Sequence, residues 1–272
     1  MISYILKQAI THSHHIFRGK TTNISYFNVE LQSGDRPERY SRKSCFSREQ
    51  KLIGLKNKLH LLRTADKKYE CIMKEKECDN SLVGNCNELA NTVFIYLARE
   101  RVSDIYNLYK NSFTANTSGE IQSIYIEILY PSPLSRYDHC FVMLYYPLHT
   151  YNIESQYKET NPLYKVYNKI PDGAWICDPW ANIVCLSENY DANWQRKMLD
   201  WAIDGKYLSL GQAPTPSIYK SKFPLQGDPG NPLYENTFYM MSNSPKTVSD
   251  QAIIRPDGTV VISNSKFEYA TQ

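Results

Sequence analysis

The stretch SLVGNCNELANTVFIYLARE, residues 81–100, predicts the helix around which the rest of the chain is organised. Asn85 is a favourable N-cap residue, and Glu88 lies at position N3, where it completes a capping box. Apolar residues then recur at helical spacing and form one stripe: Leu89, Ala90, Val93, Phe94, Leu97 and Ala98. Cys86 falls in the first turn, on the side of this stripe. The sequence therefore places a cysteine at the start of a helix, facing whatever the helix packs on.

The packing partner is predicted to be an antiparallel sheet. Four short segments that follow the helix are rich in β-branched and aromatic residues and are bounded by prolines: 121–130, 137–146, 174–178 and 182–186. Helical spacing also predicts helices at 47–62, 67–77 and 193–206, and a hairpin turn lies at Asp257 and Gly258. The expected fold class is α+β, with N-terminal helices and the cysteine-bearing helix packed on the sheet.

The chain is expected to have one main domain. Residues 1–45 are polar, and Gly19, Gly34 and Pro37 interrupt any period, so we expect an irregular N-terminal extension there. Residues 46–272 are expected to form a single catalytic domain.

Composition excludes several classes of protein. The 31 basic residues are scattered among 28 acidic ones, and the net charge is only +3, so no nucleic-acid partner is expected. Seven cysteines without a CxxC pair favour free thiols in a reducing compartment. The first ten residues include Lys7 and lack the apolar core of a signal peptide, and no run of about 18 apolar residues occurs, so a soluble protein is expected.

Three residues along the chain have the chemistry of a nucleophilic triad. Cys86 at a helix N-terminus meets the positive end of the helix dipole, which favours a thiolate. His139 interrupts an otherwise apolar strand, and Asp178 ends the strand AWICD. Taken singly, each has an ordinary structural explanation: a small buried thiol, a hydrogen-bonded core histidine, and an Asp-Pro turn. If the strands are assigned differently, Asp138 or Asp172 takes the third role.

The text around these residues resembles a known family. GNCNELA at Cys86, DHCFVML at His139 and WICDPWAN at Asp178 resemble the papain-like superfamily, specifically the transglutaminase-like and glutamine-deamidase-like enzymes that pathogenic bacteria inject into host cells. The resemblance covers residues 84–187. It implies that Cys86 is the nucleophile, His139 its base, and Asp178 the group that orients the imidazole.

The resemblance also implies that the backbone amide of Cys86 contributes to the oxyanion hole, with Asn80 or Asn85 as the side-chain donor. Trp175 and Trp180 flank Asp178 and either shield the His-Asp bond, line an acyl pocket or pack in the core.

The expected function is acyl transfer on an amide of a protein substrate. In the family that the sequence resembles, an aspartate as third member is typical of the transglutaminase and deamidase branch. The resemblance therefore implies glutamine deamidation or transglutamination of a host protein by a bacterial effector that is secreted without a signal peptide. A papain-like endopeptidase is the alternative, and a non-catalytic binding protein on the same fold is a second alternative.

No cofactor is expected. Two groups have metal-ligating side chains without a complete ligand set at a suitable spacing, so no metal site is predicted: His12, His14 and His15, and Cys140, Cys177 and Cys185. The histidine group is expected to be a solvated N-terminal stretch.

Overall fold

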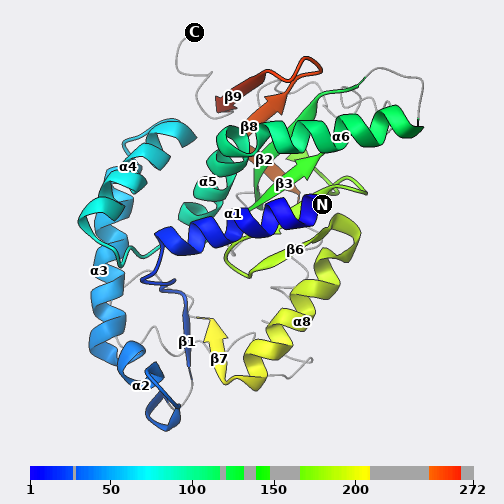
Figure 1. Ribbon diagram of the computed structural model, residues 1–272. Coiled ribbons are helices and arrows are strands. Elements are labelled where there is room, and N and C mark those ends of the chain that lie inside the picture. The colour runs from blue at the N-terminus through cyan, green and yellow to red at the C-terminus, as the bar shows by residue number, and fades with distance from the viewer. Residues whose placement is uncertain (27–28, 117–120, 132–138, 148–165, 209–244, 265–272) are drawn as a thin grey trace.

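The fold is a mixture of helices and an antiparallel sheet, as predicted. The computed structural model describes residues 1–26, 29–116, 121–131, 139–147, 166–208 and 245–264 (Figure 1). Its main sheet has seven strands in the order β4-β8-β2-β3-β5-β6, with β9 paired to β8, and each of these pairings is antiparallel. The strands are β2 (Ile124–Pro131), β3 (Phe141–Tyr145), β4 (Val166–Tyr167), β5 (Trp175–Asp178), β6 (Ile183–Leu186), β8 (Lys246–Ile254) and β9 (Val260–Asn264).

Two helices pack on this sheet. Helix α5 (Cys86–Ile95) contacts β2 and β3, and helix α1 (Ile2–Ile16) contacts β5 and β6 (Figure 1). Each of the three strands β2, β3 and β5 contributes fully buried apolar side chains to the hydrophobic core, among them Ile126, Met143 and Ile176. The cysteine-bearing helix therefore packs on an antiparallel sheet, as the sequence predicted.

The N-terminal residues were predicted incorrectly as an irregular extension. Residues 2–16 form helix α1, and its buried positions have helical spacing: Ile5, Leu6, Ala9, Ile10, Ser13 and Ile16. The breakers on which the prediction rested begin only at Gly19, after the helix has ended. Helix α1 is thus part of the core, in contact with α5 and the sheet.

The other helices agree with the predictions in place but not always in extent. Helix α3 (Arg42–Leu59) begins five residues before the expected start, because Ser41 caps it by accepting from the amide of Ser44 at 3.3 Å. Helices α4 (Ala65–Cys78) and α8 (Tyr190–Ile203) lie where helices were expected. The π-helical turn η2 (Tyr96–Glu100) continues α5 and contains Leu97 and Ala98 of the predicted stripe, whereas helix α2 (Arg36–Arg39) and helix α6 (Val102–Asn116) were not predicted.

A second, smaller sheet joins residues distant in sequence. Strand β1 (Ile24–Tyr26) pairs antiparallel with β7 (Lys206–Leu208). In Figure 1 these strands lie between α3 and α8. Two short 3-10 turns complete the described elements, η1 (Val29–Leu31) and η3 (Ser187–Asn189).

Two further features concern the thiols and the helix lengths. All seven cysteines are free thiols. Within the described ranges, no helix is both long and apolar enough to cross a bilayer.

Candidate active site

Cys86 is the first residue of α5, and the chain before it is held firmly. The Glu88 carboxylate accepts a hydrogen bond from the Asn85 amide at 2.9 Å, which is the acidic half of the predicted capping box. The Asn85 carbonyl accepts the first helical bond, from the amide of Leu89 at 3.1 Å. Cys86 is buried, and it begins a helix whose N-terminal amides and dipole favour negative charge.

Asp178 ends β5 and is fully buried, yet both of its carboxylate oxygens are saturated with donors. Oδ1 accepts from the amides of Trp180 at 3.1 Å and Ala181 at 3.0 Å. Oδ2 accepts from the Tyr190 hydroxyl at 2.8 Å and from His139 at 2.9 Å. Four hydrogen bonds fix the carboxylate in one position and offset the cost of burying its charge.

His139 is the group that joins Asp178 to Cys86. Its Nε2 atom donates to Asp178 Oδ2, and it also forms a side-chain hydrogen bond with Cys86. Because Nε2 is used by Asp178, Nδ1 is the ring atom left for the thiol. Burial lowers the pKa of His139. The negative charge of Asp178 and the hydrogen bonds with Asp178 and Cys86 outweigh burial and raise this pKa above its usual value, to about 10. The imidazole is therefore positively charged at neutral pH.

His139 was expected inside a strand but lies two residues before β3, which begins at Phe141. The rings of His139 and Phe141 are 6.1 Å apart between centroids, so the two side chains lie near each other.

Aromatic rings enclose the His139–Asp178 pair. The indole of Trp180 meets the imidazole edge to face at a centroid distance of 5.2 Å, and the indole of Trp194 lies at the same distance. Burial and the charge of Asp178 raise the pKa of Tyr190 far above its usual value, so its hydroxyl stays protonated and donates. These rings exclude water and strengthen the ion pair that they surround.

Of the two tryptophans singled out from the sequence, only Trp180 contacts the triad. Trp175 starts β5, three residues before Asp178, and is paired there with Leu144 and Leu186. A strand rises about 3.3 Å per residue, so Trp175 lies roughly 10 Å along the strand from the carboxylate. Of the alternatives considered for Trp175, this position fits core packing, since its side chain packs against the hydrophobic core.

The two asparagines proposed for the oxyanion hole are placed differently from expectation. Asn80 is exposed in the turn after α4. The Asn85 carboxamide is bonded to the segment before β1: its oxygen lies 2.7 Å from the Thr21 hydroxyl and accepts from the Thr22 amide at 3.1 Å, and its nitrogen donates to the Thr22 hydroxyl at 3.2 Å. Asn85 thus anchors the start of α5 through its side chain.

The alternative third residues do not replace Asp178. Asp172 is exposed and pairs with Lys169, with 2.9 Å between nitrogen and oxygen. Asp138 lies outside the described residues.

The sequence did not reveal that residues 14–23 support the site. Trp180 Nε1 donates to Asn23 Oδ1 at 2.8 Å and to the Thr21 hydroxyl at 3.2 Å. Burial lowers the pKa of His14, and its neutral ring donates through Nε2 to the Pro179 carbonyl at 2.7 Å. The N-terminal segment therefore holds both the cap of the nucleophile helix and the loop that follows Asp178.

The residues considered as metal ligands have other partners. His12 stacks on Tyr96 with 4.5 Å between ring centroids, and its Nε2 lies 3.0 Å from the Tyr69 hydroxyl. The expectation that His12 belongs to a solvated stretch is therefore wrong. Cys177 donates to the Leu6 carbonyl at 3.5 Å. Among the described residues, no cluster of His, Cys, Asp or Glu is arranged to hold a metal ion.

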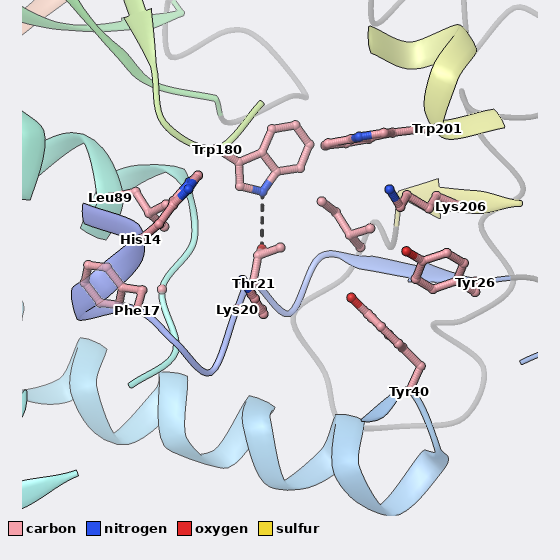
Figure 2. Close-up of a pocket in the computed structure, with 12 residues that line it drawn as sticks. His14, Phe17, Lys20, Thr21, Tyr26, Tyr40, Leu89, Trp180, Trp201 and Lys206 are labelled. Carbon is pink, nitrogen blue, oxygen red and sulfur yellow. Dashed lines mark hydrogen bonds between the residues drawn. The ribbon is translucent and has the colours of Figure 1, made fainter. Parts of the chain in front are cut away.

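A pocket of about 310 Å³ adjoins the triad on the far side of Trp180. Figure 2 shows Trp180 pointing to Thr21 at its centre, with Lys206, Tyr26 and Tyr40 on one side and His14, Phe17 and Leu89 on the other.

Comparison of the chain with protein-family models, with curated proteins and with solved structures finds no match. The site must therefore be interpreted from its own geometry.

Proposed function

We propose that this protein is a cysteine-dependent acyl-transfer enzyme of the papain-like, transglutaminase-like type, and that it deamidates or transamidates glutamine side chains of a protein substrate. One observation carries the proposal: a single buried histidine contacts both a cysteine at a helix N-terminus and an aspartate with four hydrogen bonds. Separate segments of the chain supply these three side chains, in the order and with the contacts that thiol catalysis needs.

The charge distribution supports a thiolate–imidazolium pair as the resting state. The raised pKa of His139 keeps its ring protonated at neutral pH, and the dipole of α5 stabilises negative charge on Cys86. Asp178 stabilises the imidazolium and fixes its ring orientation through Nε2. Nδ1 then carries the proton that the reaction requires.

In the proposed first step, the Cys86 thiolate attacks the carbonyl carbon of the substrate carboxamide, and the negative charge moves to the carbonyl oxygen. The Cys86 amide and the positive end of α5 stabilise this oxyanion. His139 gives its proton to the leaving nitrogen, ammonia departs, and a thioester on Cys86 remains.

In the second step, the now neutral His139 removes a proton from the incoming nucleophile. Water yields a carboxylate, which is deamidation, whereas a primary amine yields a new amide, which is transglutamination. In both cases the thiolate leaves, and His139 holds the proton again. A host protein is proposed as the substrate because of the resemblance to injected bacterial enzymes.

The test is ammonia release and incorporation of a fluorescent primary amine, measured on a glutamine-containing protein such as casein. Wild-type protein is expected to give one or both products, and Cys86→Ser is expected to give neither. Cys78→Ser is the matched control because Cys78 is an exposed thiol at the end of α4, and it should retain full activity.

Two results would contradict the proposal. Cleaved peptide bonds without ammonia release would assign the triad to an endopeptidase. Activity that persists in Cys86→Ser would show that Cys86 is not the nucleophile.

A further inference from the structure

The pocket beside Trp180 has a distinctive lining. It contains five aromatic side chains, and two lysines reach it from different segments: Lys20 after α1 and Lys206 at the start of β7. Of the described residues that line it, none is acidic. The lining residues are His14, Phe17, Lys20, Thr21, Ile24, Tyr26, Tyr40, Gly84, Leu89, Trp180, Trp201 and Lys206.

The pocket shares its wall with the catalytic groups. Gly84 and Leu89 flank Cys86 in the chain, and Trp180 contacts the His139 ring on the triad side while it lines the pocket. Thr21 also belongs to the pocket and is bonded to the Asn85 cap of the nucleophile helix. A group bound in this pocket therefore lies against Trp180, whose indole also contacts the His139 ring.

We propose that this pocket binds an acidic segment of the protein substrate, with a carboxylate against Lys20 and Lys206 and a neighbouring aromatic or aliphatic side chain against Trp180 and Trp201. The proposal rests on the proposed function, since it assigns the substrate preference of that site. It predicts that acidic residues close to the target glutamine favour binding.

The positive charge of the pocket extends behind its lining. The Arg48 guanidinium lies 4.8 Å from the centre of the Tyr40 ring and donates to the Thr21 carbonyl at 3.1 Å, and Arg36 lies 5.2 Å from the centre of the Tyr26 ring. Cations packed on aromatic rings stay close to them and add to the local potential.

Lys206 can bind a carboxylate of the substrate although it already forms an ion pair with Asp204. Its ammonium lies 2.9 Å from Asp204, whose side chain is 45% exposed at the surface, and 5.7 Å from the rings of both Tyr26 and Trp201. An ammonium has three donors, so the aromatic contacts and one exposed ion pair leave capacity for a further acceptor.

The arrangement of the indoles suits an apolar side chain of the bound segment. Trp180 and Trp201 meet edge to face at an interplanar angle of 76°, with 5.2 Å between their ring centroids. They offer one flat wall and one edge, which suits a phenyl ring or an aliphatic side chain.

The experiment measures peptide binding to full-length Cys86→Ala by tryptophan fluorescence, so that it does not depend on turnover. The probes are three blocked heptapeptides with a central glutamine and one phenylalanine. They differ only in the two residues that flank this pair, which are both glutamate, both glutamine or both lysine. We expect the glutamate peptide to bind most tightly, the lysine peptide most weakly, and the preference to fall as salt is raised.

Variants of the lysines identify the site. Lys206→Gln is expected to weaken binding of the glutamate peptide about tenfold and to leave the glutamine peptide nearly unchanged. Lys197→Gln is the matched control, because Lys197 also lies over Trp201, at 6.0 Å, but does not line the pocket. Lys20→Asn is a second variant that removes a charge while tolerating the left-handed backbone of this position, where φ is 68°.

Equal affinity for the three peptides, or an unchanged preference in both lysine variants, would refute the proposal. So would tighter binding of a mononucleotide or of inorganic phosphate than of the glutamate peptide. Because Cys86→Ala is inactive by design, acidic-peptide binding without any activity in wild-type protein would overturn the proposed enzyme and leave the pocket assignment intact.

Discussion

Replacing Asp178 with asparagine removes one negative charge from a fully buried position while keeping the shape of the side chain. The amide oxygen can still accept from the backbone amides of Trp180 and Ala181. The other end of the side chain then presents an NH₂ group to His139 Nε2, where a carboxylate oxygen stood. The pKa of His139 should therefore fall, because the charge that raises it is lost while the burial that lowers it remains.

The size of the effect follows from the ionisation of His139. Because the charge of Asp178 raises the pKa of His139 to about 10, its ring is mostly protonated at pH 7. Loss of an adjacent carboxylate is expected to lower the pKa by about 2 pH units or more. Heteronuclear NMR titration of the imidazole signals, with His139 assigned through His139→Gln, measures this shift directly.

Asp172→Asn is the matched control, because Asp172 is the exposed alternative to Asp178 and should leave His139 unchanged. Ammonia release should fall by about 10²-fold or more in Asp178→Asn and remain at the wild-type level in Asp172→Asn. A His139 titration curve that is the same in Asp178→Asn and wild-type protein would refute the reasoning.

Three further changes test the surroundings of the triad. Leu6→Ala should lower the free energy of unfolding by about 2–5 kcal/mol in urea titrations, because Leu6 is fully buried; a negligible loss would support an irregular N-terminal extension instead. Thr21→Val removes the hydroxyl between Asn85 and Trp180 and should slow alkylation of Cys86 severalfold, at a stability cost of about 1–2 kcal/mol; an unchanged rate would show that Thr21 does not influence Cys86. The pKa of His139 is higher in the folded than in the unfolded protein, so its stabilising contribution is complete below about pH 6.5 and is lost as pH rises through about 10. Unfolding free energies at pH 7 and pH 10 should therefore differ more in wild type than in His139→Gln, and equal differences would contradict the assigned pKa.

The triad could be predicted because each member carries a local signal. Cys86 follows an N-cap residue, His139 interrupts an apolar run, and Asp178 ends a strand before a proline. These signals depend only on neighbours in the chain, and the structure brings the three side chains together. The sheet and helix α5 could also be predicted from local patterns: short segments rich in β-branched and aromatic residues for the strands, and apolar residues at helical spacing for α5.

The hydrogen bonds that hold the triad residues in place could not be predicted, because they join segments that are distant in the sequence. Thr21 lies 64 residues before Asn85 and 159 before Trp180, and hydrogen bonds between such segments leave no period in the sequence. Tyr190 comes from a helix that was expected to start at 193, so its bond to Asp178 was missed. The helical spacing of residues 2–16 was present in the sequence, but the breakers after Gly19 obscured it.

The measurement that tests the central claim most directly is alkylation of the native protein by iodoacetamide from about pH 5 to about pH 9, with all seven cysteines quantified by peptide mass spectrometry. The account predicts that Cys86 is labelled first at the acidic end of this range, and that it loses this lead in His139→Ala. If Cys86 reacts no faster than Cys45 or Cys71, or keeps its lead without His139, the thiolate–imidazolium pair does not exist and the proposed enzyme is contradicted.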